Sequence, residues 1–200
     1  MIPIYELVME EDNGGVDLIS FVQSPAMKTN WVAFSEEQPV MFNIQSEEKR
    51  IVSGAIILAD FPVIRMSEDG KPYYVMLKED TIAKTVQKFF KNSWHIGTNA
   101  NHDKSSISNG AYMFESYIIN RERGINPPEG FDFAKDGSWF GSYKVESDEM
   151  WAKVKSGEFN GFSIEGYYNL KQIEFKEEKT TDEQLLESLR ALEAVVSKIS

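Results

Sequence analysis

Alternating hydrophobic and polar residues dominate the first half of the chain and predict short strands. The predicted strands are rich in β-branched and aromatic residues, and clusters of Gly, Pro, Asn or Glu separate them. They cover residues 16–22, 31–34, 40–45, 50–58 and 73–77. Before the last of these, Asp69-Gly70 favours a hairpin turn, because glycine readily adopts the positive φ that such turns require. The pattern therefore predicts an antiparallel sheet or barrel.

The hydrophobic period changes at Asp80, which we predict to be the N-cap of a helix over residues 81–91. Four hydrophobic residues follow the spacing of one helix face: Ile82, Val86, Phe89 and Phe90. A polar stretch then leads into a predicted strand over 111–119. We expect His102 to lie where this loop meets a strand.

The second half of the chain predicts a long loop over 121–137 and a strand over 138–145. Ser147 is expected to cap a short helix that Gly157 ends. Residues 159–170 then alternate as a strand. This alternation sets two groups on opposite faces, Phe162 and Ile164 on one and Ser163, Glu165 and Tyr167 on the other.

The C-terminal segment predicts a separate element. We expect a protein domain over 1–175, then a charged linker and an amphipathic helix over 176–200, opened by Thr180 and Glu183 at capping-box spacing. Hydrophobic residues recur there at steps of four and three, as in a coiled coil: Leu185, Leu189, Leu192, Val196 and Ile199. Because the run covers only about two heptads, the helix needs a partner: its own domain, another copy in a homo-oligomer, or sequence beyond Ser200.

Composition limits the partners and the compartment. The 200 residues are 42% hydrophobic and 12% aromatic, enough for one well-packed domain. The net charge of −11 repels nucleic acid and anionic membranes, which favours a protein or peptide partner. The absence of cysteine excludes disulfides, thiolate zinc sites and a cysteine nucleophile. With no secretory signal and no apolar stretch near the roughly 20 residues of a membrane helix, we expect an intracellular protein without a membrane span.

Two histidines restrict the possible catalytic bases. His102 lies in a polar loop, whereas His95 follows Trp94 in an apolar segment where a histidine more often packs than reacts. A serine hydroxyl becomes nucleophilic only when a neighbouring base removes its proton. The alternating pattern alone leaves Ser163 and Glu165 as ordinary solvent-facing residues, and His102 as a surface polar residue. A metal site built on both histidines lacks a third ligand at a familiar spacing.

Several short motifs, taken in order, go beyond this pattern. Asn101-His102-Asp103 precedes a glycine-led strand, and a helix ending in Lys155-Ser156-Gly157-Glu158 precedes Gly161-Phe162-Ser163-Ile164-Glu165-Gly166. Weaker features lie earlier, in residues 17–26 and 50–54. Over residues 16–170, this order and spacing resembles the prohead maturation proteases of tailed phages, in particular their prophage-type branch. These serine proteases are related in fold to the herpesvirus assembly protease, and their order of histidine before serine differs from that of α/β-hydrolases.

The resemblance implies a mostly β (α+β) fold, a barrel-like antiparallel sheet with flanking helices that is similar to the herpesvirus protease. It also implies that Ser163 is the nucleophile and His102 the base of a serine endopeptidase. This enzyme would work through an acyl-enzyme, without metal or cofactor. Its substrates would be scaffolding and capsid proteins, and the protease itself, inside the assembling prohead in the host cytoplasm. The alternative is a catalytically inactive assembly module that recruits capsid partners.

The resemblance does not identify the third catalytic residue. The herpesvirus enzymes use a second histidine downstream of the serine, which this chain lacks, whereas the phage enzymes use an acidic residue. We choose Glu165, because two residues along a strand place it on the same face as Ser163, about 7 Å away. Asp103 and Glu174 are the other candidates. The sequence does not identify the oxyanion-hole donors.

Overall fold

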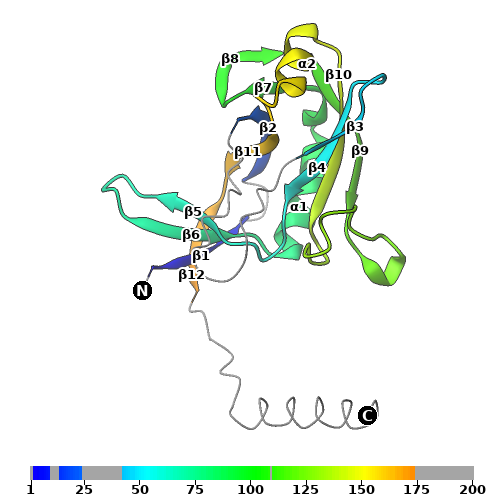
Figure 1. Ribbon diagram of the computed structural model, residues 1–200. Helices are drawn as coiled ribbons and strands as arrows, with labels where there is room; N and C mark the ends of the chain where they lie inside the picture. Colours follow the sequence, from blue (N-terminus) through cyan, green and yellow to red (C-terminus); the bar gives the residue numbers. More distant parts are fainter. Residues whose placement is uncertain (1, 10–13, 24–41, 109, 174–200) are drawn as a thin grey trace, which may run out of the picture.

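The computed structural model of the chain describes residues 2–9, 14–23, 42–108 and 110–173 (Figure 1). The helical elements in this part are α1 (Glu79–Lys91), α2 (Asp148–Lys155) and the 3₁₀ turns η1 (Trp94–Ile96) and η2 (Arg121–Arg123). The strands are β1 (Ile4–Val8), β2 (Gly15–Val22), β3 (Asn43–Ser46), β4 (Ile51–Ile57), β5 (Val63–Met66), β6 (Pro72–Met76), β7 (Thr98–Ala100), β8 (Asp103–Ser108), β9 (Ala111–Ile118), β10 (Trp139–Val145), β11 (Gly161–Tyr167) and β12 (Asn169–Ile173). None of the described helices is long and apolar enough to cross a membrane.

The described strands form three four-stranded sheets. Sheet 1 has the order β12-β1-β6-β5, sheet 2 the order β3-β4-β10-β9, and sheet 3 the order β11-β2-β7-β8. In Figure 1, the hairpin of β5 and β6 extends away from the rest of the molecule, and α1 lies beside sheet 2. The mostly β class predicted from the sequence is therefore confirmed.

The prediction of a barrel-like antiparallel sheet is wrong in two respects. No closed barrel forms among the described strands, because each of the three sheets keeps two edge strands. Two pairings are parallel, β1 with β6 and β2 with β7. Parallel neighbours are joined by long crossover connections, so the local pattern around a strand does not reveal which distant strand lies beside it.

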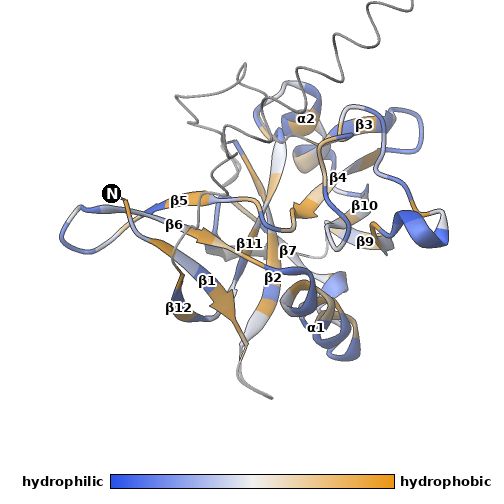
Figure 2. Ribbon diagram, turned by 90° about the horizontal axis from the view of Figure 1, so that it is seen from below, coloured by the Kyte–Doolittle hydropathy of each residue, from blue (hydrophilic) through white to orange (hydrophobic). Residues whose placement is uncertain are grey.

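Aromatic side chains fill the core between sheets 2 and 3. Phe21 of β2 packs edge-on against Phe162 of β11 and Tyr143 of β10, with ring centroids 5.2 and 5.4 Å apart. Phe89 of α1 contacts Trp139 of β10 at 5.3 Å. These five side chains are at most 2% exposed, and Figure 2 shows hydrophobic positions on the strands that lie near α1. One face of β2 and one face of β11, those that carry Phe21 and Phe162, are therefore buried in this core. The residues next to Phe21 and Phe162 in each strand lie on the opposite face of the sheet.

The helix boundaries agree with the sequence prediction at one helix and differ at the other. α2 begins after Ser147, whose Oγ accepts a hydrogen bond from the Met150 amide at 3.3 Å, as a cap should. α1 begins earlier than predicted, at Glu79, so Asp80 lies in the first turn and Lys78 occupies the N-cap. Glu79 and Asp80 favour a helix that begins at this position, because negative charge stabilises the N-terminal end of a helix.

The segment predicted as one strand over 159–170 is divided into β11 and β12. The pairing of β11 with β2 shifts register between Glu165 and Gly166. There the two backbones approach so closely that a Cβ atom on Gly166 would lie 1.9 Å from the carbonyl oxygen of Gly15. β11 ends at Tyr167, and β12 then pairs with β1 in sheet 1. The chain that carries Ser163 and Glu165 therefore connects sheet 3 to sheet 1.

Four strands have no counterpart in the sequence prediction: β1 and β5 of sheet 1, and β7 and β8 of sheet 3, which form within the predicted polar stretch before residue 111. β1 and β5 are short and only partly buried, so neither produces a strong hydrophobic pattern. The strand predicted over 31–34 lies outside the described residues. The same holds for the predicted linker and helix over 176–200, and therefore for the proposed domain boundary.

Candidate active site

Three polar residues form a row across sheet 3. The register of β11 with β2 sets Ser163 opposite Ser20, and the register of β2 with β7 sets Ser20 beside Asn99. All three are at most 4% exposed. Because Phe21 and Phe162 point into the aromatic core, strand alternation places the row on the opposite face of the sheet. Buried polar side chains need hydrogen-bond partners, and these partners define the site.

His102 lies in a tight turn directly before β8. Ala100 pairs with Asp103, so Asn101 and His102 are the two turn residues, with φ of 50° and 63°. A two-residue hairpin of this type requires positive φ at both positions, which costs a non-glycine residue about 1–2 kcal/mol. The Asn101 amide donates to the Phe21 carbonyl oxygen at 2.9 Å, which fixes the turn against the end of β2. The strained turn thereby holds the imidazole next to the polar row.

Glu165 is the centre of the hydrogen-bond network. Its Oε1 accepts hydrogen bonds from Ser20 Oγ at 2.8 Å and from Asn99 Nδ2 at 2.7 Å, and lies 3.1 Å from His102 Nδ1. Burial of the carboxyl group by itself raises the pKa of Glu165. The hydrogen bonds from Ser20, Asn99 and His102 outweigh it and lower the pKa below its ordinary value. Glu165 is therefore a carboxylate at neutral pH, held in place from three sides.

The His102 ring meets this carboxylate through one nitrogen. Nδ1 lies 3.1 Å from Glu165 Oε1 and 3.2 Å from Ser20 Oγ. Among the described residues, Nε2 has no hydrogen-bond partner. A carboxylate at Nδ1 favours the tautomer with the proton on that nitrogen, which leaves Nε2 as an acceptor. The arrangement is suited to take a proton from a hydroxyl group at Nε2.

Ser163 lies on the same strand as Glu165, two residues before it. The structure brings His102 and Glu165 into contact but does not join Ser163 to either of them: within the described part of the chain, its side chain forms no hydrogen bond with His102. Its cross-strand neighbour Ser20 contacts the imidazole instead. Catalytic hydrogen bonds are often long or form only when substrate binds, so Ser163 stays the candidate nucleophile without a hydrogen bond to His102.

Ser20 and Asn99 are residues of the site that the sequence prediction missed. Ser20 lies in the early segment 17–26 that contributed to the resemblance, but nothing in its local pattern linked it to His102 or Glu165. Asn99 lies in the polar stretch before His102. Both reach Glu165 because β2 and β7 are parallel neighbours, and no local sequence signal predicted that pairing.

The other residues considered from the sequence lie elsewhere. Asp103 begins β8, next to the turn, and Glu174 lies outside the described residues. His95 stacks on Phe90, with ring centroids 5.1 Å apart, and its buried Nδ1 has no hydrogen-bond partner in the described chain. Among the described residues, no group of three or more histidine, aspartate or glutamate side chains could hold a metal ion.

Comparison with known proteins identifies the family. No curated protein and no solved structure matches the chain. A family model with the description Putative phage serine protease XkdF matches residues 39–172, which is more than half of the chain. The matched part contains His102, Ser163 and Glu165, whereas Ser20 lies before it. The match confirms the resemblance drawn from the motifs: the chain belongs to the family of phage serine proteases described as Putative phage serine protease XkdF.

Proposed function

We propose that the chain is a serine endopeptidase in which Ser163 is the nucleophile, His102 the general base and Glu165 the acid that orients the histidine. One observation carries this proposal: the 3.1 Å contact of His102 Nδ1 with Glu165 Oε1, next to the face of sheet 3 that carries Ser163. Membership of a phage serine protease family supports the reaction class. Neither the sequence prediction nor the family match depends on this contact.

The reaction would follow the chemistry of a serine–histidine–acid triad. Nε2 of His102 accepts the proton of Ser163 Oγ as that oxygen attacks the carbonyl carbon of the peptide bond. The imidazolium then gives this proton to the leaving amine as the C–N bond breaks, and water hydrolyses the acyl-enzyme by the same steps. Glu165 keeps the proton on Nδ1 and stabilises the imidazolium. This step requires Nε2 of the half-exposed His102 ring to come within hydrogen-bond distance of Ser163 Oγ when substrate binds.

Ser20 is the competing candidate for the nucleophile, because it already contacts the imidazole. However, the Ser20 Oγ lies against Nδ1, the ring nitrogen that faces the carboxylate. The Ser20 hydroxyl group donates its hydrogen bond to Glu165 and not to the ring. A nucleophile must instead give its proton to the opposite ring nitrogen. The position of Ser20 suits a residue that holds Glu165, and that of Ser163 suits the nucleophile once Nε2 reaches it.

The biological substrates follow from the resemblance of the motifs. We propose that the enzyme cleaves scaffolding and capsid proteins, and itself, during maturation of the phage prohead in the host cytoplasm. β11 is an edge strand of sheet 3, since among the described strands it pairs with β2 alone. An extended peptide bound along this edge would pass Ser163. The herpesvirus-protease-like fold and a homo-oligomer formed by the C-terminal helix remain predictions.

A fluorophosphonate probe, followed by mass spectrometry of the labelled peptide, tests the proposed function. We expect label on Ser163 in the wild-type protein and none in Ser163→Ala or His102→Ala. Label on Ser20 would assign the nucleophile to β2 instead. If correctly folded and assembled wild-type protein takes up no label, the chain is the inactive assembly module considered from the sequence.

A further inference from the structure

A large cavity opens beside the candidate active site, between sheets 1 and 3. Its volume is about 780 Å³, and Glu165 lies in its wall together with Leu7, Leu18, Tyr73 and Val75. Sheet 1 contributes β1, β5, β6 and β12 to this wall, and sheet 3 contributes β2 and β11. Such a concave space next to reactive groups, lined by both apolar and polar side chains, is where an enzyme binds part of its substrate.

Arg65 of β5 is the only lysine or arginine among the described residues that line the cavity. Its Nη1 donates to the neighbouring Ile64 carbonyl oxygen at 3.1 Å, and Arg65 forms no ion pair with a described carboxylate. Burial lowers the pKa of its guanidinium group. Because a guanidinium carries five N–H donors in a fixed plane, most of its hydrogen-bonding capacity remains available within the cavity.

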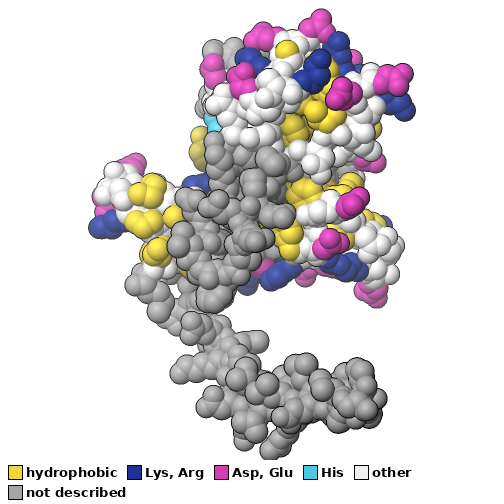
Figure 3. Space-filling model, in the orientation of Figure 1, with side chains coloured by type: hydrophobic (Ala, Val, Ile, Leu, Met, Phe, Trp, Pro, Cys, Tyr) yellow, Lys and Arg dark blue, Asp and Glu magenta, His cyan; other side chains and the backbone are white. Residues whose placement is uncertain are grey.

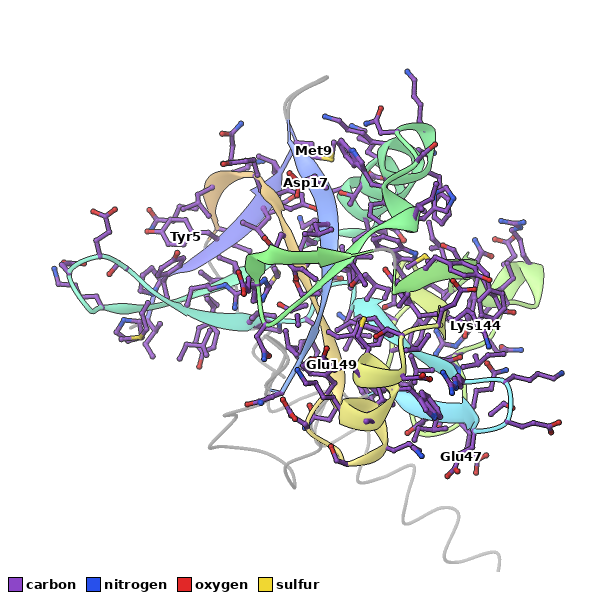
Figure 4. All side chains as sticks on the ribbon, turned by 90° about the horizontal axis from the view of Figure 1, so that it is seen from above. Tyr5, Met9, Asp17, Glu47, Lys144 and Glu149 are labelled. Atoms are coloured by element: carbon purple, nitrogen blue, oxygen red, sulfur yellow. The ribbon has the colours of Figure 1, made fainter. Side chains whose placement is uncertain are left out.

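The two acidic residues in the cavity wall, Asp17 and Glu165, do not pair with the Arg65 guanidinium group. Asp17 is exposed and lies near the N-terminal end of β2, as Figure 4 shows. Glu165 already accepts hydrogen bonds from Ser20 and Asn99 and faces His102. Neither acid lies within ion-pair distance of Arg65. Arg65 therefore has no carboxylate partner among the described residues, and the acidic group of a bound peptide would supply one.

Arg65 also lines a second, smaller cavity, of about 50 Å³, whose wall includes Ser163. Leu7, Val75 and Ile164 are shared by both cavities as well. The guanidinium thus borders the spaces next to both the proposed nucleophile and the proposed acid. A peptide along the edge of β11 would direct alternate side chains toward this region, because successive residues of a strand point to opposite faces.

We propose that the larger cavity binds an acidic side chain, aspartate or glutamate, of an extended peptide substrate, with Arg65 as the residue that recognises its carboxylate. This inference rests on the proposed peptidase function, since it assigns substrate selectivity to the same site. Planar, bidentate pairing of arginine with a carboxylate supplies the selectivity, and the apolar residues around it exclude water. The free C-terminus of a peptide offers the same chemistry, so the experiment separates the two sources.

Peptide binding to the full chain carrying Ser163→Ala tests the inference without depending on turnover. The probe is a positional library of extended peptides, made once with amidated and once with free C-termini, in which each position in turn is fixed as Glu, Gln, Lys or Leu. We expect Glu to be preferred to Gln at one position by about tenfold or more, the range of a charge-assisted hydrogen bond. Arg65→Gln should abolish this preference, and Arg65→Glu should turn it toward Lys. Arg123→Gln, a change of an exposed arginine on η2, is the matched control and should keep the preference.

Three results would overturn the inference. They are equal binding of Glu and Gln peptides at every position, an equal loss of preference in the Arg65 and Arg123 variants, and selective binding only of peptides with a free C-terminal carboxylate. The last result would identify the cavity as a site for a chain end. A wild-type protein that takes up fluorophosphonate on Ser163 but shows no acidic preference leaves the peptidase function intact and removes only this selectivity.

Discussion

Glu165 Oε1 lies 3.1 Å from His102 Nδ1, across the face of sheet 3. The two residues come from the edge strand β11 and from the turn between β7 and β8, and β2 lies between these elements. Ser20 of that central strand donates a hydrogen bond to the same carboxylate oxygen at 2.8 Å. The orientation of the proposed catalytic base therefore depends on a strand that carries neither member of the pair.

Replacement of Ser20 tests its role in holding Glu165. We expect Ser20→Ala to lower kcat by about 10- to 100-fold with little change in KM, because the loss of one hydrogen bond to a charged group costs roughly 1.5–3 kcal/mol. Fluorophosphonate should still label Ser163 in this variant, more slowly than in the wild type. Complete loss of labelling would instead indicate that Ser20 is the nucleophile.

Ser142 provides the control for that experiment. It is also a buried strand serine that donates a hydrogen bond to a glutamate, Glu115, but it lies in sheet 2. Ser142→Ala should lower the free energy of unfolding about as much as Ser20→Ala does, yet leave kcat unchanged. Equal losses of kcat in the two variants would show that Ser20 acts only through stability.

The assignment of the acid is tested by amide substitution. Glu165→Gln keeps the shape of the side chain but removes the charge that stabilises the imidazolium, so we expect kcat to fall by roughly 100-fold. The fall should be much smaller than that caused by Ser163→Ala and clearly larger than that caused by Glu174→Gln. Steady-state hydrolysis of a peptide substrate measures all three. If the two glutamine variants lose activity equally, Glu165 is not the orienting acid.

The lowered pKa of Glu165 predicts a dependence of stability on pH. A carboxyl group whose pKa is lower in the folded than in the unfolded protein stabilises the fold above its unfolded pKa of about 4.3. This contribution is lost as the pH falls through the folded pKa. We therefore expect Glu165→Gln to lower the free energy of unfolding at about pH 7, and the difference from wild type to shrink at about pH 3.5.

Urea unfolding of both proteins at the two pH values measures this effect. Glu129→Gln, a substitution of an exposed glutamate in the loop before β10, should change the free energy of unfolding little at either pH. A difference between Glu165→Gln and wild type that is independent of pH would contradict the assignment of the lowered pKa to the hydrogen bonds around Glu165.

The close approach of β11 to β2 at Gly166 predicts that adding a single methyl group there strongly destabilises the fold. A Cβ atom on Gly166 would lie 1.9 Å from the Gly15 carbonyl oxygen, a distance that backbone atoms cannot accommodate without separating β11 from β2. We expect Gly166→Ala to lower the free energy of unfolding by about 3 kcal/mol or more. At Gly97 the same substitution meets no atom within 4 Å and a negative φ of −105°, so Gly97→Ala should be nearly neutral. Comparable losses in the two variants would contradict the close approach.

Exposed hydrophobic side chains mark the hairpin of β5 and β6, which Figure 3 shows at the side of the molecule. Met66 and Ile64 are 62% and 36% exposed. The same hairpin carries Arg65, whose side chain lines both cavities. The strand that sets the proposed selectivity therefore also presents an apolar surface, whereas no hydrophobic pattern in the sequence predicted a strand at these residues.

The sequence by itself determined the mostly β class, the cap of α2, and the order of motifs that led to the phage serine protease family. These features are local: alternation of side chains, a serine at a helix start and short motifs are all read within a few residues. For the same reason, alternation along residues 159–170 was enough to set Ser163 and Glu165 on one face of a strand.

Only the tertiary structure decided which residues meet across the sheet. The parallel pairing of β2 with β7 brings Ser20 and Asn99 to Glu165, and the turn with positive φ at His102 sets the imidazole against the same carboxylate. Long crossover connections leave no local trace of such pairings, because the chain between the paired strands folds as other elements. The register shift at Gly166, just before β11 ends at Tyr167, depends likewise on the approach of Gly15 from a distant strand. Residue types and spacing therefore identified candidates for catalysis, while the packing of strands distant in sequence set the network that positions them.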